Sequence, residues 1–138
     1  MRTFDGFFET LGDMDWLAIL VATLVVGLVL GTIFYGPVFG KKWAAASGVP
    51  YTMKAPANQI IWGLIVGFIF QIGVAFLGAT DDIEHSIVTA LVFGVFVVGA
   101  VLYSRVVWSK GSRTVFFIDF AYLFLAIAVG GYVQGLMA

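Results

Sequence analysis

Residues 16–43 hold the feature that most constrains this chain, a long apolar run that ends in basic and aromatic residues. The run reads WLAILVATLVVGLVLGTIFYGPVFGKKW, and no charge interrupts it before Lys41 and Lys42. About 20 apolar residues, each rising 1.5 Å, cross the hydrocarbon core of a bilayer, and tryptophan favours its two interfaces. The sequence therefore predicts a transmembrane helix over residues 15–36.

The composition extends this prediction to the whole chain. Of 138 residues, 62% are apolar and 11% are charged, whereas about a quarter of the residues of a soluble domain are charged. Three further apolar segments cover residues 57–79, 86–108 and 113–137. We therefore predict an all-α, polytopic membrane protein, with four transmembrane helices in an antiparallel bundle that forms one domain over residues 15–138.

The composition also excludes several kinds of active site. The chain has no cysteine, which excludes disulfides, thiol catalysis and thiolate metal sites, and its net charge of −1 gives no general attraction to nucleic acid. His85 is the single histidine, so one chain cannot build a multi-histidine metal site. No serine or carboxylate constellation suggests an intramembrane enzyme. We expect no catalytic residue, no metal and no cofactor, and we expect that the protein is not an enzyme.

Residues 1–14 predict a short amphipathic helix before the first span. Phe4, Phe7, Phe8 and Leu11 recur at helical spacing, which places them on one face. The polar face is acidic, so attraction to anionic lipid does not hold this helix on the membrane. It is either an interfacial lead-in or a docking helix for a partner.

Glycine and proline mark where the first span stops. Gly36-Pro37 is expected to end it, because proline lacks the amide hydrogen that a continuing helix needs and disfavours helical geometry in the preceding residue. Residues 41–47 then predict a short interfacial helix that Gly48 terminates.

An acidic turn at residues 81–84 precedes the third span. A cluster of carboxylates beside His85 raises the question of a metal site, but carboxylates also cap helix starts. Asp81 and Glu84 have the spacing of a capping box. We therefore favour capping over metal binding here.

Paired glycines recur four residues apart in three of the predicted spans. Such pairs let helices approach closely inside a bilayer. The helix-packing candidates are Gly27, Gly31, Gly63, Gly67, Gly131 and Gly135.

Polar residues inside the apolar spans are candidates for structural or pathway roles. Gln71 lies near the middle of the second span and needs partners on neighbouring helices. Arg105 and Asp119 lie on either side of a tight turn, at depths that differ by roughly 3 Å at the helical rise, so we predict an ion pair. The alternative is that Arg105 extends to lipid phosphate while Asp119 meets tyrosine or amide groups.

The basic residues predict the orientation of the chain. Six of the seven lie in the loops after the first and third spans, namely Lys41, Lys42, Lys54, Arg105, Lys110 and Arg113. The positive-inside rule places these loops in the cytoplasm and both termini outside it. In a bacterium this is a multi-pass protein of the inner membrane.

Two motifs resemble those of a family of small bacterial integral membrane proteins classed as a domain of unknown function. The first is Tyr35-Gly36-Pro37-Val38-Phe39-Gly40-Lys41-Lys42-Trp43, which follows a span that opens with aspartate-tryptophan. The second is RTVFFIDFAY, which begins at Arg113 and ends at Tyr122. In the family, a tryptophan usually stands where this chain has Phe34. The resemblance implies four spans and no known activity, and it adds Tyr122 to the structural or pathway candidates.

Two functions fit these observations. The first is a membrane protein that acts by helix–helix assembly, as a homo-oligomer or as an accessory subunit of a larger membrane complex; its partners would be lipid and other membrane helices. The alternative is a small channel or proton-coupled transporter that uses Asp119. Against the alternative, four-span multidrug exporters of similar length carry a carboxylate in the first span, and this chain has none there.

Overall fold

The computed structural model describes residues 4–48, 57–109 and 111–137, and the regular elements in these ranges are all helices. Four helical segments are long and apolar enough to cross a membrane, and we number them spans 1 to 4. They are Trp16–Val38, Ala57–Phe76, Ile83–Trp108 and Arg113–Met137. The predicted all-α, multi-pass architecture is confirmed. Lys54 and Lys110, which contribute to the predicted orientation, lie outside the described residues.

Span 1 is assembled from alternating α- and π-helical pieces. They are α2 (Trp16–Leu24), η1 (Val25–Leu30), α3 (Gly31–Ile33) and η2 (Phe34–Val38). Asp15 caps the first turn, because its carboxylate accepts a hydrogen bond from the amide of Ala18 at 3.1 Å. In a π-turn the backbone amide bonds the carbonyl five residues back, as the amide of Gly31 does with the carbonyl of Val26.

The end of span 1 differs from the expectation that Gly36-Pro37 stops the helix. The helix continues to Val38, and Pro37 lies inside η2. The amide of Phe39 bonds the carbonyl of Phe34, five residues back, at 2.9 Å. A π-turn of this kind carries the chain past a proline that has no amide hydrogen to donate.

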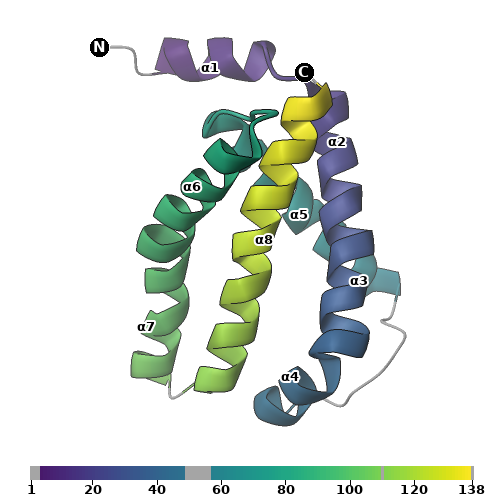
Figure 1. Ribbon diagram of the computed structural model, residues 1–138, viewed down its shortest axis with the longest axis vertical. Coiled ribbons are helices and arrows are strands. Elements are labelled where there is room, and N and C mark those ends of the chain that lie inside the picture. Colours follow the sequence, from purple (N-terminus) through teal and green to yellow (C-terminus); the bar gives the residue numbers. More distant parts are fainter. Residues whose placement is uncertain (1–3, 49–56, 110, 138) are drawn as a thin grey trace.

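Two short helices lie at opposite ends of the spans (Figure 1). α1 (Phe4–Gly12) runs across the end where span 4 finishes, roughly perpendicular to the spans. α4 (Gly40–Ser47) lies at the other end, near the turn between α7 and α8. Gly48 ends α4 with a φ of 78°, a left-handed conformation that glycine adopts without steric cost, so the predicted short helix and its terminator are confirmed.

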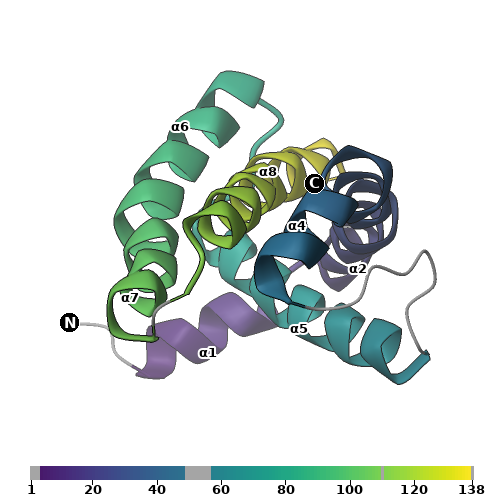
Figure 2. The same ribbon diagram turned by 90° about the horizontal axis from the view of Figure 1, so that it is seen from below.

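Span 4, formed by α8 (Arg113–Met137), lies between the other spans (Figures 1 and 2). Span 3 lies on one side of it and consists of α6 (Ile83–Phe93), η3 (Gly94–Gly99) and α7 (Ala100–Ser109). Span 1 lies on the other side, and α5 (Ala57–Phe76) crosses obliquely and contacts both α2 and α8. Residues of α8 are therefore placed to bind side chains from every other span.

Apolar residues form the contact between spans 2, 3 and 4. Val74, Ala90 and Ile127 are buried together, and Phe70, Val98, Phe124 and Ala128 pack around them. In a bilayer, lipid is as apolar as these side chains, so this contact depends on close van der Waals packing rather than on exclusion of water.

An aspartate caps span 3, as predicted, but it is the neighbour of the expected one. Asp82 is the N-cap of α6, and its Oδ1 accepts a hydrogen bond from the amide of Glu84 at 3.0 Å. The capping residue is thus Asp82 rather than Asp81, and the helix begins at Ile83 instead of residue 86.

Most of the predicted packing glycines face other parts of the same chain. A Cβ atom at five of the six would lie within 4 Å of an atom from another element: Gly27, Gly31, Gly67, Gly131 and Gly135. At Gly135 it would overlap the backbone of Thr80. Gly63 differs, because nothing lies within 4 Å of its Cβ position among the described residues. Packing inside one chain therefore accounts for most of the glycine pattern.

Replacement of Gly31 by leucine is expected to lower stability, because its Cβ position lies 3.2 Å from the hydroxyl of Tyr122. The larger side chain would separate spans 1 and 4. The check is the melting temperature in detergent micelles, with Gly73→Leu as the control, since among the described parts of the chain nothing lies within 4 Å of the Cβ position of Gly73. Equal melting temperatures for the two variants would contradict the prediction.

Candidate functional site

Polar side chains line one face of α8, which we call the polar stripe. Asp119, Tyr122 and Gln134 fall within an arc of about 120° at 3.6 residues per turn. Ala126 and Gly130 lie between them on the same face and leave room for side chains from other spans. Asp119 and Tyr122 are half-buried and Gln134 is buried. The stripe thus runs along the inside of the protein rather than on its lipid-facing surface.

Asp119 is held by two aromatic donors from the other end of the sequence. Its Oδ1 accepts a hydrogen bond from the hydroxyl of Tyr35 at 2.5 Å and one from the indole Nε1 of Trp43 at 2.9 Å. Tyr35 lies in η2 and Trp43 in α4, so the carboxylate ties span 4 to both the end of span 1 and the short helix that follows.

The local sequence between the two donors explains how they converge. Phe39 leaves helical geometry, with φ −123° and ψ 0°, and α4 begins at the next residue. This break turns α4 so that the rings of Tyr35 and Trp43 meet edge to face, with centroids 5.8 Å apart. Phe34 and Tyr122 pack against Tyr35 from the other sides, with centroids 5.4 and 5.1 Å from its ring. Packing therefore fixes the direction in which the phenol points.

The predicted ion pair between Arg105 and Asp119 is wrong. Among the described residues no ion pair joins them; Arg105 is exposed, and Oδ1 of Asp119 binds Tyr35 and Trp43 instead. Equal depth of Arg105 and Asp119 on adjacent helices does not make them partners here, because side chains from a third segment, which contains Tyr35 and Trp43, bind Asp119. The tyrosine part of the alternative expectation for Asp119 is correct.

The geometry of the donors determines what Asp119 can bind. A phenol hydroxyl and an indole N–H both lie at ring edges, so the carboxylate meets ring edges, whereas aromatic residues that hold a cation present their faces. Oδ2 of Asp119 accepts no hydrogen bond from the described residues. Among those residues, Ser86 Oγ is the one enclosed side-chain polar atom without a partner, so Oδ2 is not enclosed. Oδ2 of Asp119 can therefore accept a hydrogen bond from a further donor.

Tyr122 connects the stripe to the first π-turn of span 1. Its hydroxyl donates a hydrogen bond to the backbone carbonyl of Val26 at 3.1 Å. The same carbonyl accepts the amide of Gly31, five residues on, as the π-helical pattern requires. Because Gly31 has no side chain, the tyrosine reaches the helix backbone.

Gln71 meets the stripe from span 2, as its predicted need for partners on neighbouring helices requires. Its Nε2 donates to the carbonyl of Ala126 at 3.3 Å, and its Oε1 accepts from Nε2 of Gln134 at 3.2 Å. Gln134 also donates to the backbone carbonyl of Gln71 at 3.1 Å. A Cβ at Gly130 would overlap the amide of Gln71, so the network depends on that glycine.

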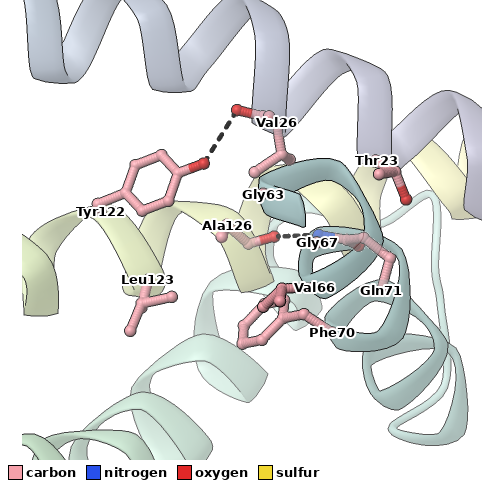
Figure 3. Close-up of a pocket in the computed structure, with 11 residues that line it drawn as sticks. Thr23, Val26, Gly63, Val66, Gly67, Phe70, Gln71, Tyr122, Leu123 and Ala126 are labelled. Carbon is pink, nitrogen blue, oxygen red and sulfur yellow. Dashed lines mark hydrogen bonds between the residues drawn. The ribbon is translucent and has the colours of Figure 1, made fainter. Parts of the chain in front are cut away.

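A pocket of about 160 Å³ lies beside the stripe, between span 1, α5 and α8 (Figure 3). Its polar lining residues are Thr23, Gln71 and Tyr122, and the other lining residues are glycine, alanine or larger apolar side chains. Figure 3 shows the hydrogen bond from Tyr122 to Val26 and that from Gln71 to the carbonyl of Ala126. The polar side chains of Tyr122 and Gln71, which line the pocket, are therefore each held by a hydrogen bond within the protein.

One side of the pocket is open to the outside of the protein. Gly63 lines this side, and no atom of another described residue lies within 4 Å of its Cβ position; Val66 beside it is 62% exposed. Both residues belong to a helix that is long and apolar enough to cross a membrane, so in a bilayer this opening would face lipid rather than water.

One known protein family matches the part of the chain that contains this site. The family model described as a protein of unknown function, DUF1761, matches residues 17–135. The chain belongs to this family. No curated protein and no solved structure matches this chain. The DUF1761 match includes the π-turn, α4 and the whole polar stripe, but the family brings no activity with it.

The sequence candidates of this DUF1761 protein are only partly brought together. Asp119, Tyr122 and Gln71 belong to one connected region, whereas Arg105 lies apart and is exposed. Sequence reasoning missed three polar partners, Tyr35, Trp43 and Gln134, and it missed Thr23 as a lining residue of the pocket. A signal existed for Gln134, since its spacing from Asp119 places it on the same face of a helix. No spacing rule links Trp43 to Asp119.

Proposed function

We propose that this DUF1761 protein is a small, non-enzymatic transport protein of the membrane, whose working residues lie on span 4. The observation that supports this proposal is the polar stripe of α8, half-buried at Asp119 and Tyr122 and buried at Gln134, beside a pocket within the spans. Polar side chains inside a bilayer cost free energy, and in membrane proteins they commonly mark solute or ion pathways. In this proposal the transported molecule binds in the pocket.

Asp119 is the ionisable group of the proposed transport cycle. A proton at Oδ2 would change the charge to which Tyr35 and Trp43 donate their hydrogen bonds. Tyr35 packs on Tyr122 with ring centroids 5.1 Å apart, and Tyr122 lines the pocket. A change at Asp119 therefore reaches the pocket through two packed rings.

Transport is tested in liposomes that contain the purified protein and a pH-sensitive dye. An acid pulse is applied in the presence of each compound of a panel of small lipophiles, and proton entry is recorded. We expect compound-dependent proton entry that is lost in Asp119→Asn and kept in Glu84→Gln, a control at the exposed end of span 3. No proton entry above empty liposomes with any compound would contradict the proposal, and equal entry in Asp119→Asn would exclude Asp119 as the coupling group.

Helix–helix assembly is the second candidate function, as a homo-oligomer or as an accessory subunit of a larger membrane complex. Gly63 favours it, because this glycine exposes bare helix backbone to the bilayer while the other paired glycines pack within the chain. The chain has no cysteine, so Gly63→Cys gives a single thiol for oxidative cross-linking in native membranes. Gly73→Cys is the matched control on the same helix, since its position is equally open. Cross-linking at 63 but not at 73 would support assembly at this face, and cross-linking at neither would contradict it.

For its location we propose the bacterial inner membrane, with both termini outside the cytoplasm. The support is that Lys41 and Lys42 of α4 lie at the same end of the spans as Arg113 (Figure 1). A membrane-impermeant thiol reagent added to whole cells is expected to label Gly12→Cys but not Ala45→Cys, since both positions are exposed and lie at opposite ends. The reverse labelling pattern would invert the orientation.

A further inference from the structure

We propose that the pocket between span 1, α5 and α8 binds a neutral, mostly apolar molecule about the size of one ring, which carries a single hydroxyl or carbonyl group and enters from the bilayer. This inference rests on the proposed transport function and specifies the ligand class of the same site.

The size of the pocket limits the ligand. Its volume is about 160 Å³. A cavity of about 150 Å³ with apolar walls accommodates benzene in a well-studied soluble protein. The pocket therefore takes one aromatic ring or a short branched chain, and it excludes molecules with two fused rings or bulky substituents.

The walls exclude a charged ligand. None of the residues that line the pocket is charged. An ion would lose its hydration without gaining a counter-charge, which is costly inside a bilayer. Asp119 does not line the pocket and lies three residues before Tyr122, which does.

Two polar groups remain able to bind one ligand group. The hydroxyl of Tyr122 uses its hydrogen for the carbonyl of Val26, and its oxygen can still accept. Nε2 of Gln71 carries two hydrogens, of which one reaches the carbonyl of Ala126. The Oε1 of Gln71 already accepts from Gln134. Tyr122 thus offers an acceptor and Gln71 a donor, and a single hydroxyl can use both.

The route of entry follows from the open side of the pocket. Gly63 and the exposed Val66 border it, and both lie within α5, in the membrane. A neutral lipophile concentrates in the bilayer, so it reaches this side without crossing water. A leucine at position 63 has space to exist in the folded protein and would obstruct the opening.

The test uses three fluorinated probes that differ in one group, namely 4-fluorotoluene, 4-fluorobenzyl alcohol and 4-fluorobenzylammonium. Fluorine NMR of the full chain in lipid nanodiscs measures saturable binding, and empty nanodiscs measure partition into lipid. We expect the alcohol to bind saturably, fluorotoluene to bind about three- to tenfold more weakly for want of the hydrogen bonds, and the ammonium to show no saturable binding. Binding of the alcohol is expected to disappear in Gly63→Leu and to remain in Gly73→Leu, whose site lies on the same helix outside the pocket.

Several results would overturn the inference. Saturable binding of the ammonium as tight as that of the alcohol would refute the neutral class. Equal affinity of toluene and alcohol would refute the role of Tyr122 and Gln71. Absence of saturable alcohol binding, or equal binding in Gly63→Leu, would refute the pocket as the site. Binding in nanodiscs requires no transport, so the two proposals can fail separately. If the alcohol does not bind in nanodiscs but compounds still drive proton entry in liposomes, the ligand class alone is rejected. If the alcohol binds but no compound drives proton entry, the transport function alone is rejected.

Discussion

Asp119→Ala is expected to lower the free energy of unfolding by about 2–4 kcal/mol, because two donors inside the protein lose their shared acceptor. The hydroxyl of Tyr35 and the indole N–H of Trp43 both bind Oδ1 of Asp119. The loss also frees α4 from span 4, so the loosened part is the end of the molecule that carries α4. The measurement is a denaturation curve of the purified protein in mixed micelles with increasing sodium dodecyl sulfate.

Two further variants separate this hydrogen-bonded cluster from an ion pair. Arg105→Ala is the control, since Arg105 is exposed, and it should change stability by about 0.5 kcal/mol or less. The double variant Asp119→Ala with Trp43→Phe should cost less than the sum of the single changes, because the two residues share one bond. If the stability costs of Arg105→Ala and Asp119→Ala are non-additive while those of Trp43→Phe and Asp119→Ala are additive, Asp119 pairs with Arg105 in the membrane and not with Trp43.

Gly130→Ala is expected to cost about 2–4 kcal/mol, although it adds a single methyl group to a helix. The added Cβ would overlap the amide of Gln71. That amide would have to leave its hydrogen bonds with Ala126 and Gln134, and these groups would then be unpaired inside the protein. Alanine is the better helix former, so propensity alone predicts the opposite sign.

The rescue of this variant tests the cause. In a Gln71→Ala background the obstructing amide is gone, so Gly130→Ala should cost much less than it does alone. Gly73→Ala is the control for helix propensity, because Gly73 has open space around it, and it should be neutral or slightly stabilising. A Gly130→Ala variant as stable as the unchanged protein, or one that Gln71→Ala does not rescue, would contradict the proposed packing of Gln71.

The two motifs that resemble a known family bind each other in the structure. They supply the donors Tyr35 and Trp43 and the acceptor Asp119, which bind one another although they lie far apart in the sequence. A motif of this kind is explained by a three-way contact rather than by any single residue. The cluster lies within the segment that the DUF1761 model matches.

The amino-acid sequence by itself determined the spans and their order. Apolar runs of the length of a bilayer have few alternatives to a transmembrane helix, because every backbone amide and carbonyl must be paired where water is absent. For the same local reason Gly48 could be placed as the end of α4, and a carboxylate could be expected at the start of span 3. These features depend on neighbours within a few residues, so composition and spacing contain them.

The tertiary structure alone decided which polar groups meet and what the glycines do. Asp119 had two plausible neighbours at its depth, and the choice of Tyr35 and Trp43 over Arg105 followed from the break at Phe39, which turns α4. Gly63 and Gly67 share one motif, yet Gly67 packs on Thr23 while Gly63 borders an open pocket, because α5 crosses span 1 at an angle. Helix crossing angles and π-turns depend on packing summed over many side chains, and no short window of sequence records that sum.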